Sequence, residues 1–284
     1  MAQVELSAGT IDYVDTGGPG PVLVLGHGVP MSSTQWRKVV PLLSGYRCVL
    51  PTLPLGGHRI PMRADADLSQ FGVARLLGDF LERLDLQDVT LVLNDWGGGQ
   101  FLITERFPGS ERVARLALVA CEAFDNVPPG PVKPLGVIAA VPGGMWLLLQ
   151  LLRVRAVRDN RYAYGGMSVR GIPEAVLADW FRPARESRAI RRDFAKFATG
   201  APRRRTLLEC SERLRDFDRP ALVVWATEDR LMPREHGSRL AALLPQAHLV
   251  EIAESSTLVP EDQPERLAEA LARFLARTGA ESVG

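Results

Sequence analysis

Residues 89–100 read VTLVLNDWGGGQ, and this stretch decides the fold that we expect. Val89 to Leu93 is a short, β-branched apolar run, which is typical of a strand buried on both faces. The run ends at a polar residue and an acid, three glycines follow at 97–99, and an amphipathic stretch begins at Phe101. The pattern predicts a strand that turns sharply into a helix, with Asp95 at the tip in a strained backbone conformation.

A strand, turn and helix of this kind form a nucleophile elbow, in which small residues let the strand and the helix approach each other. The usual pattern is Gly-x-Ser-x-Gly, whereas here Asp95 takes the tip, Gly97 follows and Leu93 precedes it. A carboxylate at the tip attacks carbon directly and forms an ester with the protein. The stretch 94–98 resembles the aspartate-nucleophile branch of the α/β-hydrolase superfamily, the epoxide hydrolases and haloalkane dehalogenases. A plain Gly-rich turn with Asp95 as a helix N-cap fits less well, because G-x-G-x-x-G is not matched.

The resemblance implies an α/β-hydrolase fold, in which helices flank a mostly parallel central sheet and a helical cap is inserted. The alternation of predicted strands and helices stops after residue 125 and resumes at Pro220. We therefore expect a first part of the core at 1–125, a helical cap at 126–205 and a second part of the core at 206–284. Expected strands lie at 4–14, 21–25, 48–50, 89–93, 113–119, 220–225 and 249–252, and expected helices at 32–43, 68–84, 101–107 and 263–275.

The loop after the strand at 21–25 reads Gly26-His27-Gly28-Val29-Pro30. In the resembled family this loop gives one main-chain N–H to the oxyanion site, and the residue after the nucleophile gives the other. The resemblance therefore implies Val29 and Trp96 as the two donors, with His27 bracing the loop.

A carboxylate, Asp229, follows the strand at 220–225, and by resemblance it is the supporting acid of the catalytic triad. The third member in this family is a histidine between the last strand and the final helix. Aligned on Pro260, that position holds Thr257, and none of the four histidines of the chain lies in this loop. The triad is therefore expected to be incomplete.

The missing histidine affects the two halves of the reaction differently. Attack by Asp95 needs no base, because a carboxylate is ionised at neutral pH. Hydrolysis of the ester needs a base to activate water, and losing one costs on the order of 10²–10⁴-fold. Another residue can take this role: His58, in a loop near the site, or Glu122, which follows a strand where some dehalogenases keep their acid. Two further interpretations stay open: a non-hydrolytic enzyme (rearrangement, elimination or cyclisation) and a catalytically silent protein that binds small molecules.

Two substrate classes fit the resemblance. Haloalkane dehalogenases hold the leaving halide with the tryptophan after the nucleophile, which Trp96 matches, but Val29 replaces a frequent asparagine donor. Epoxide hydrolases use cap tyrosines to protonate the ring oxygen, and Tyr162 and Tyr164 are the candidates here. We therefore expect a small apolar electrophile, epoxide-like before halide-like, and neither a cofactor nor a metal.

Composition narrows the partners. The net charge is +1, which gives no reason to expect a nucleic-acid partner. The three cysteines, Cys48, Cys121 and Cys210, are odd in number and far apart, which predicts free thiols in a reducing compartment. The start of the chain lacks the features of a signal peptide. We expect a cytoplasmic protein that binds a small molecule and no membrane, with a homo-oligomer possible.

The segment from Leu135 to Leu152 is long and apolar enough to require comparison with a membrane span. Pro142 and Gly143 interrupt it, so two short buried helices are the better prediction. From Gln150 to Arg205 basic residues exceed acids by nine. A solvated helical surface is the default interpretation, with attraction of an anionic substrate or partner as the alternative.

Overall fold

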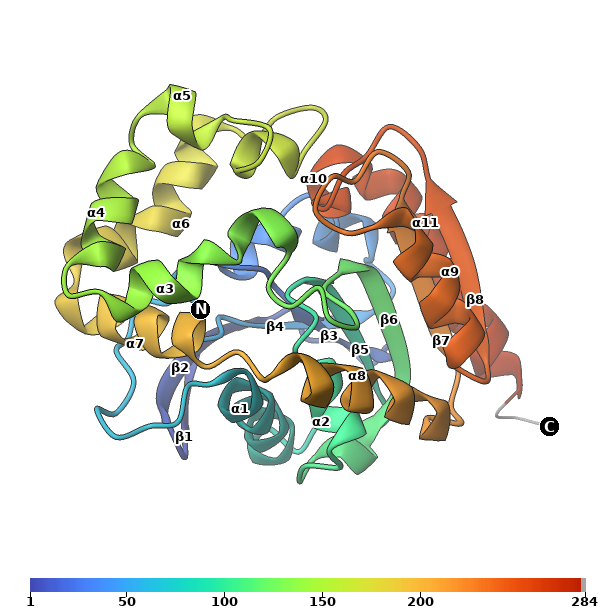
Figure 1. Ribbon diagram of the computed structural model, residues 1–284. Helices are drawn as coiled ribbons and strands as arrows, with labels where there is room; N and C mark the ends of the chain where they lie inside the picture. The colour runs from blue at the N-terminus through green and yellow to red at the C-terminus, as the bar shows by residue number, and fades with distance from the viewer. Residues whose placement is uncertain (282–284) are drawn as a thin grey trace.

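Eight strands form one sheet in the computed structural model, which describes residues 1–281 (Figure 1). The strand order is β1-β2-β4-β3-β5-β6-β7-β8; β1 and β2 pair antiparallel, β2 also pairs antiparallel with β4, and the remaining pairs are parallel. The strands are β1 (Ala2–Leu6), β2 (Gly9–Asp15), β3 (Val22–Gly26), β4 (Arg47–Pro51), β5 (Val89–Asp95), β6 (Val113–Cys121), β7 (Ala221–Ala226) and β8 (Ala247–Ile252). This is the α/β-hydrolase arrangement that the sequence predicts.

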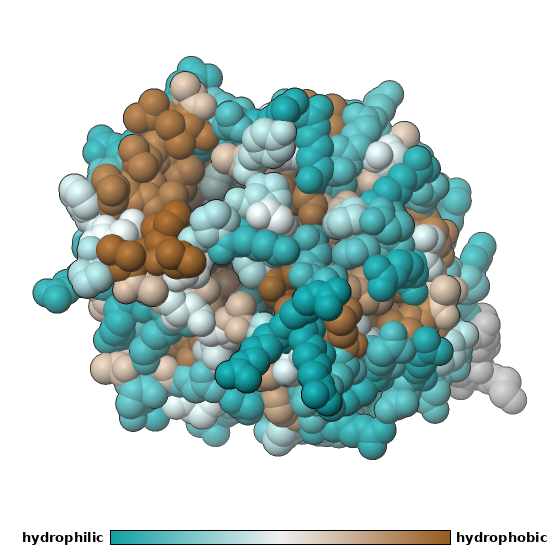
Figure 2. All heavy atoms as spheres, viewed as in Figure 1, coloured by the Kyte–Doolittle hydropathy of each residue, from teal (hydrophilic) through white to brown (hydrophobic). Residues whose placement is uncertain are grey.

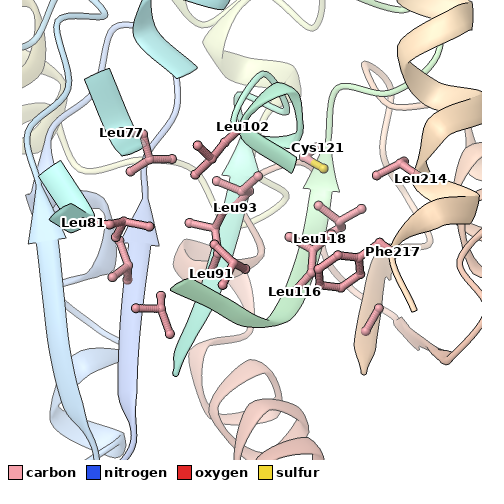
Figure 3. Close-up of a cluster of buried hydrophobic side chains, with 14 of the residues drawn as sticks. Leu77, Leu81, Leu91, Leu93, Leu102, Leu116, Leu118, Cys121, Leu214 and Phe217 are labelled. Carbon is pink, nitrogen blue, oxygen red and sulfur yellow. The ribbon is translucent and has the colours of Figure 1, made fainter. Parts of the chain in front are cut away.

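Helices cover both faces of the sheet and bury its apolar side chains. One face packs against α1 (Gln70–Arg83), α2 (Gln100–Thr104) and α9 (Arg234–Leu243), and Figure 3 shows leucines of α1, β5 and β6 gathered there. The other face packs against α11 (Pro264–Glu281) and the 3₁₀ turns Ser33–Trp36 and Val40–Leu42. Because both faces are covered, β5 is buried along its whole length, as its unbroken apolar run predicts.

Two predicted elements differ from the structure. The single strand expected at 4–14 is an antiparallel pair, β1 and β2, because the chain reverses just before Gly9, whose φ is +134°. The helix expected at 32–43 consists of two 3₁₀ turns, since Pro41 cannot donate a helical hydrogen bond. The last three residues of the predicted second part of the core lie outside the described residues.

Helices between β6 and β7 lie over the carboxyl ends of the parallel strands. We call α3 to α7 the cap: α3 (Pro134–Ala140), α4 (Gly144–Leu151), α5 (Arg155–Arg158), α6 (Glu174–Glu186) and α7 (Arg188–Thr199), with 3₁₀ turns at Gly130–Val132 and Tyr164–Gly166. A third apolar cluster joins the cap to the core and includes Leu53, Trp96, Trp180 and Phe194. After the cap, α8 (Arg204–Glu212) returns the chain to the core, and α10 (Val259–Asp262) precedes α11; further 3₁₀ turns lie at Ser110–Arg112 and Arg213–Asp216.

The apolar segment 135–152 forms α3 and α4, separated at Pro142 and Gly143 as predicted. The expectation that these helices are buried is wrong, because each packs inward on one side only. Val137, Trp146 and Leu147 are 71%, 51% and 53% exposed. Among residues 1–281 no helix is long and apolar enough to cross a membrane.

Candidate active site

The elbow turn lies at the end of β5. Asp95 has a φ of +63°, in the left-handed region that non-glycine residues adopt rarely and at a cost. The chain then turns through three glycines into α2, which begins at Gln100. The strained tip that the sequence predicts is therefore found at Asp95.

Glycines make this turn possible by letting chains approach closely. A β-carbon on Gly97 would collide with the carbonyl oxygen of Glu122, and one on Gly28 would collide with the Asp95 carboxylate. Leu93, which stands where the usual pattern has glycine, fits because its neighbours are small. A β-carbon on Gly26 or Gly99 would come within 2.9 or 2.7 Å of Leu93 Cδ2.

The two oxygens of the Asp95 carboxylate have different surroundings. Oδ2 accepts a hydrogen bond of 2.8 Å from the main-chain N–H of Val29. Oδ1 has no hydrogen-bond partner within residues 1–281, and the side chain lines a cavity. Burial raises the pKa of Asp95 to about 7; the Val29 N–H opposes this rise and the charge of Asp229 adds to it. One oxygen is held, and the other is free to meet a ligand.

The cavity has a volume of about 210 Å³ and lies between core and cap. Its walls are mostly apolar: Val29, Pro30 and Leu231 come from the core, and Leu135, Ile138, Leu148, Leu149, Leu152, Met167, Phe194 and Phe197 come from the cap. The polar side chains that line it are Gln70, Asp95, Glu122, Tyr162 and Tyr164. This lining suits a small apolar ligand with few polar groups.

Glu122 lies beside Asp95 and lines the same cavity. Its main-chain N–H donates to the carbonyl oxygen of Asp95 at 2.9 Å, so the ends of β5 and β6 are joined. The carboxyl is buried, and its Oε2 has no hydrogen-bond partner among the described residues. Burial, and then the charge of Asp95, raise the pKa of Glu122 well above its ordinary value. Its surroundings therefore disfavour the ionised form of the Glu122 carboxyl.

Asp229 and Thr257, which the sequence assigns to the acid and histidine positions of the triad, are in contact. The Thr257 hydroxyl donates to Asp229 Oδ1 at 2.8 Å, and the N–H groups of Leu231 and Met232 donate to the same oxygen. Asp229 Oδ2 is buried without a partner among the described residues, and burial raises the pKa of this carboxyl to about 6. Neither side chain lines the cavity.

A side-chain network that the sequence does not predict ties these parts together. Asn94 Nδ2 donates to the carbonyl oxygens of Thr257 and Val119, at 2.7 and 2.8 Å. Asn94 Oδ1 accepts from Gln35, whose own carbonyl accepts from the Gly28 N–H at 2.7 Å. The elbow, the Val29 loop and the Thr257 loop are therefore held by one chain of hydrogen bonds. The position of Asn94 next to the elbow tip is the one signal that could have pointed to it, whereas nothing in the sequence marks Gln35.

His58 is not brought to the cavity. Both ring nitrogens have partners, since Nε2 lies 3.3 Å from Asp193 Oδ2 and Nδ1 accepts from the Gly56 N–H. Burial lowers the pKa of His58, and Asp193 opposes that shift. His27 is also buried, accepts from the Leu53 N–H at 2.8 Å and braces the loop as expected. Of the two alternative bases that we considered, only Glu122 lines the cavity with Asp95.

Trp96 faces away from the cavity. Its indole N–H donates to Gln70 Oε1 at 2.6 Å, and its ring packs edge-on against Phe197. Its main-chain N–H has no partner among the described residues, so it is available to an oxygen at Asp95. Gln70 does line the cavity, and because its oxygen is taken, its amide N–H groups are the polar face it can offer a ligand. Nothing in the sequence indicates that Gln70 contacts a ligand, because it lies at the start of an ordinary amphipathic helix.

The two cap tyrosines occupy different positions. Tyr164 is partly buried, and its hydroxyl donates to the Val29 carbonyl oxygen at 3.2 Å. Burial and the nearby Asp95 raise the pKa of Tyr164 well above its ordinary value. Tyr162 is 57% exposed and lies at the outer part of the cavity, with its ring under the Arg161 guanidinium. Only Tyr164 lies next to Asp95.

Among the described residues no cluster of three His, Cys, Asp or Glu side chains could hold a metal ion. The three cysteines are buried and free, as predicted. The chemistry that the described side chains offer is that of a strained, partly ionised carboxylate in an apolar cavity. One main-chain N–H holds its first oxygen, a second acid lies beside it, and hydroxyl and amide donors face the same space.

Known proteins resemble the chain in sequence and in fold. The sequence model of the alpha/beta hydrolase family matches residues 22–270. A haloalkane dehalogenase of Mesorhizobium japonicum is 36% identical over 120 residues, which cover 42% of this chain and 38% of that protein. Haloalkane dehalogenase 2 of Mycobacterium bovis is 28% identical over 290 residues, covering 93% of this chain and 91% of its own.

A solved structure agrees with these matches at the level of the fold. The haloalkane dehalogenase DbeA of Bradyrhizobium elkani superposes with a TM-score of 0.79 at 20% identity, covering 99% of this chain and 98% of that one. At this identity the likeness shows the fold alone.

Proposed function

Because the chain belongs to the alpha/beta hydrolase family, we propose that it is a hydrolase whose Asp95 carboxylate attacks a carbon atom of a small apolar electrophile. The observation that carries the proposal is the asymmetry of this carboxylate. Oδ2 is held by the Val29 N–H, while Oδ1 has no hydrogen-bond partner among residues 1–281, and the side chain lines an apolar cavity. A nucleophile presented in this way to a bound ligand gains from proximity and from exclusion of water.

The first step forms an ester. Asp95 Oδ1 bonds to the electrophilic carbon, and the bond from that carbon to the leaving atom breaks with its electron pair. In an epoxide the leaving oxygen stays on the product and takes a proton, which in this proposal comes from the Tyr164 hydroxyl after it leaves the Val29 carbonyl oxygen. In an alkyl halide the halide leaves as an anion and needs N–H donors, for which the Gln70 amide is placed.

The second step, hydrolysis of the ester, is expected to be the slow one. Water must attack the Asp95 carboxyl carbon and lose a proton, while the N–H groups of Val29 and Trp96 stabilise the oxyanion. Glu122 is the candidate base within the cavity, but burial raises its pKa well above its ordinary value and so disfavours the ionised form that a base needs. Thr257 has no basicity near pH 7. We therefore propose that the ester forms readily and is hydrolysed slowly.

Two observations favour epoxides over alkyl halides. Tyr164 lies at the cavity beside Asp95, and the Trp96 indole N–H, which a halide would need, is bonded to Gln70. The names of the relatives favour the halide instead, since those cited above are haloalkane dehalogenases. Both classes therefore belong in the first assay.

The test is intact-mass spectrometry after incubation with small terminal epoxides and small alkyl bromides. We expect the wild type to gain the mass of the whole epoxide, or the mass of the alkyl bromide less HBr. Asp95→Asn is the matched control, and we expect it to lower adduct formation by at least about 10³-fold. Adduct formation by the control at the wild-type rate would contradict the role of Asp95.

The alternatives that stay open give different results in the same experiment. Product formation without any adduct, lost in Glu122→Gln but kept in Asp95→Asn, would place the chemistry on Glu122. Neither adduct nor product with any electrophile would favour the non-hydrolytic enzyme or the binding protein.

A further inference from the structure

The outer face of the cap carries an apolar surface that the proposed reaction does not use. We call it the cap patch: Val137, Val141, Trp146, Leu147, Leu151, Val154 and Val157, all of which are exposed. Figure 2 shows hydrophobic side chains gathered where Figure 1 places α4 and α5. Single exposed apolar residues are ordinary, but a contiguous group marks a surface that something else covers.

The charged residues within the segment that carries the patch have one sign. From Asn126 to Arg158 there is no Asp or Glu, while Lys133, Arg153, Arg155 and Arg158 are basic. Arg153 and Arg155 alternate along the chain with exposed members of the patch. Arg153 makes no ion pair within the described residues, and Arg155 is 3.6 Å from Asp159. Arg158 is buried and bonded to Glu174, so it serves the fold instead.

The apolar surface and the arginines beside it favour one kind of binding partner over the others. A second copy of the chain would bring Arg153 and Arg155 against the same residues of the first, and like charges at an interface oppose association. A membrane that contains anionic lipid offers acyl chains to the apolar residues and negative headgroups to the arginines. Helices that lie on a membrane have this composition, apolar residues with basic residues beside them.

We propose that the cap patch binds the surface of a lipid bilayer that contains anionic lipid, with α4 and its neighbours lying at the headgroup level. This departs from our expectation of no membrane partner, which weighed only a helix that crosses the bilayer. It stands independently of the chemistry at Asp95.

The patch is also the outer side of the cavity wall. Ile138, Leu148 and Leu152 line the cavity, while their neighbours Val137, Leu147 and Leu151 face outward. One layer of helix therefore separates the cavity from the surface that would meet the lipid. An apolar ligand dissolved in the bilayer would lie close to the cavity when the cap is docked.

A built-in reporter makes the proposal easy to test. Four of the five tryptophans, Trp36, Trp96, Trp180 and Trp225, are fully buried, and Trp146 of the patch is the exposed one. Titration with phosphatidylcholine vesicles, with and without phosphatidylglycerol, should shift tryptophan emission to shorter wavelength only with the anionic lipid. Trp146→Phe should remove the shift but keep the protein in the vesicle pellet after centrifugation.

Matched variants separate the patch from general effects. Arg153→Glu should weaken binding to anionic vesicles about 10- to 30-fold, since each basic residue near such a surface contributes about 1 kcal/mol. Arg83→Glu makes the same charge change at the end of α1, which belongs to the core and not to the cap, and should have a smaller effect. Leu147→Ser with Leu151→Ser should abolish binding, whereas Leu249→Ser on the exposed strand β8 should not.

Several results would overturn the proposal. They are absence of binding to either vesicle, equal binding with and without phosphatidylglycerol, and equal loss in Arg153→Glu and Arg83→Glu. Sedimentation velocity adds another: a dimer that Leu147→Ser with Leu151→Ser dissociates would mean that a second copy covers the patch.

Discussion

In the core, Asp95 and Glu122 are buried and Asp229 is half-buried around the carboxyl ends of the central strands, and each carboxyl keeps one oxygen without a hydrogen-bond partner among the described residues. On the outer face of the cap, Arg153 and Arg155 stand in solvent among apolar side chains. The acids are hidden and raised in pKa, while the bases are exposed. Burying ionisable groups costs free energy, so the acids mark the place where the fold gives up stability for chemistry. Exposed arginines cost little folding free energy, and their side chains are accessible to a binding partner in solution.

The first test, on the core, supplies the base that the proposed second step lacks. Thr257→His places an imidazole next to Asp229, which can accept its N–H, and we expect ester hydrolysis to speed up on the order of 10²–10⁴-fold. The measurement is the decay of the alkylated mass after excess electrophile is removed. Thr257→Gln is the control, because it adds similar bulk without basicity. Equal decay rates in both variants would mean that the base is elsewhere.

The second test uses pH. In the proposed reaction Asp95 attacks as the carboxylate, and burial raises its pKa to about 7. The alkylation rate should therefore rise about 90-fold from pH 5 to pH 8, with its midpoint near pH 7. Asp229→Asn removes a nearby negative charge that raises this pKa, so the midpoint should move to lower pH. A rate that is flat over this range would show that Asp95 is ionised throughout.

The third test concerns stability. Asp95 and Glu122 have pKa values above those of the unfolded chain, so these two groups bind more protons in the folded state between pH 4 and pH 7. Their contribution to the free energy of unfolding should therefore fall as pH rises through this window, while buried His27, whose pKa is lowered to about 4, contributes in the opposite direction. Glu122→Gln removes one such group, and we expect it to raise stability at pH 8 by about 1–3 kcal/mol, with little change at pH 4. Thermal melts of the wild type and Glu122→Gln at the two pH values measure this difference. A melting temperature of Glu122→Gln below that of the wild type at pH 8 would contradict the prediction.

The smallest effect is expected on the cap. Leu147→Ser changes an exposed side chain that packs little against the rest of the protein, so stability should change by no more than about 0.5 kcal/mol. Leu93→Ala, in the core, should instead cost about 2–5 kcal/mol. Urea unfolding of both variants checks this. A large loss in Leu147→Ser would mean that the patch stabilises the fold rather than waiting for a partner.

The core could be predicted from the sequence because its signals are local. The buried run of β5, the spacing of apolar residues in α1 and the order of elbow, acid and final loop each imply one arrangement. Contacts between distant side chains carry no such signal, so the bonds of Gln35 to Asn94 and of Gln70 to Trp96 were not predicted.

The errors have physical causes of the same kind. Gly9 and Pro41 were visible in the sequence, and each interrupts the element that we had expected to continue. In the cap, the sequence pattern of an apolar helix is the same whether the protein or another partner covers the helix. We therefore expected α3 and α4 to be buried. Exposure depends on how many neighbours a helix has, and only the three-dimensional structure contains that information.

The Thr257 hydroxyl, which donates to Asp229 after the last strand, has no basicity near pH 7 with which to take a proton from water. In the proposed chemistry such a protein removes its electrophile mole for mole. Each molecule captures one equivalent and stays occupied until the ester is cleaved or the chain is degraded and replaced. The capacity of a cell to remove the compound would then follow the number of protein molecules it makes, and synthesis would have to keep pace with supply.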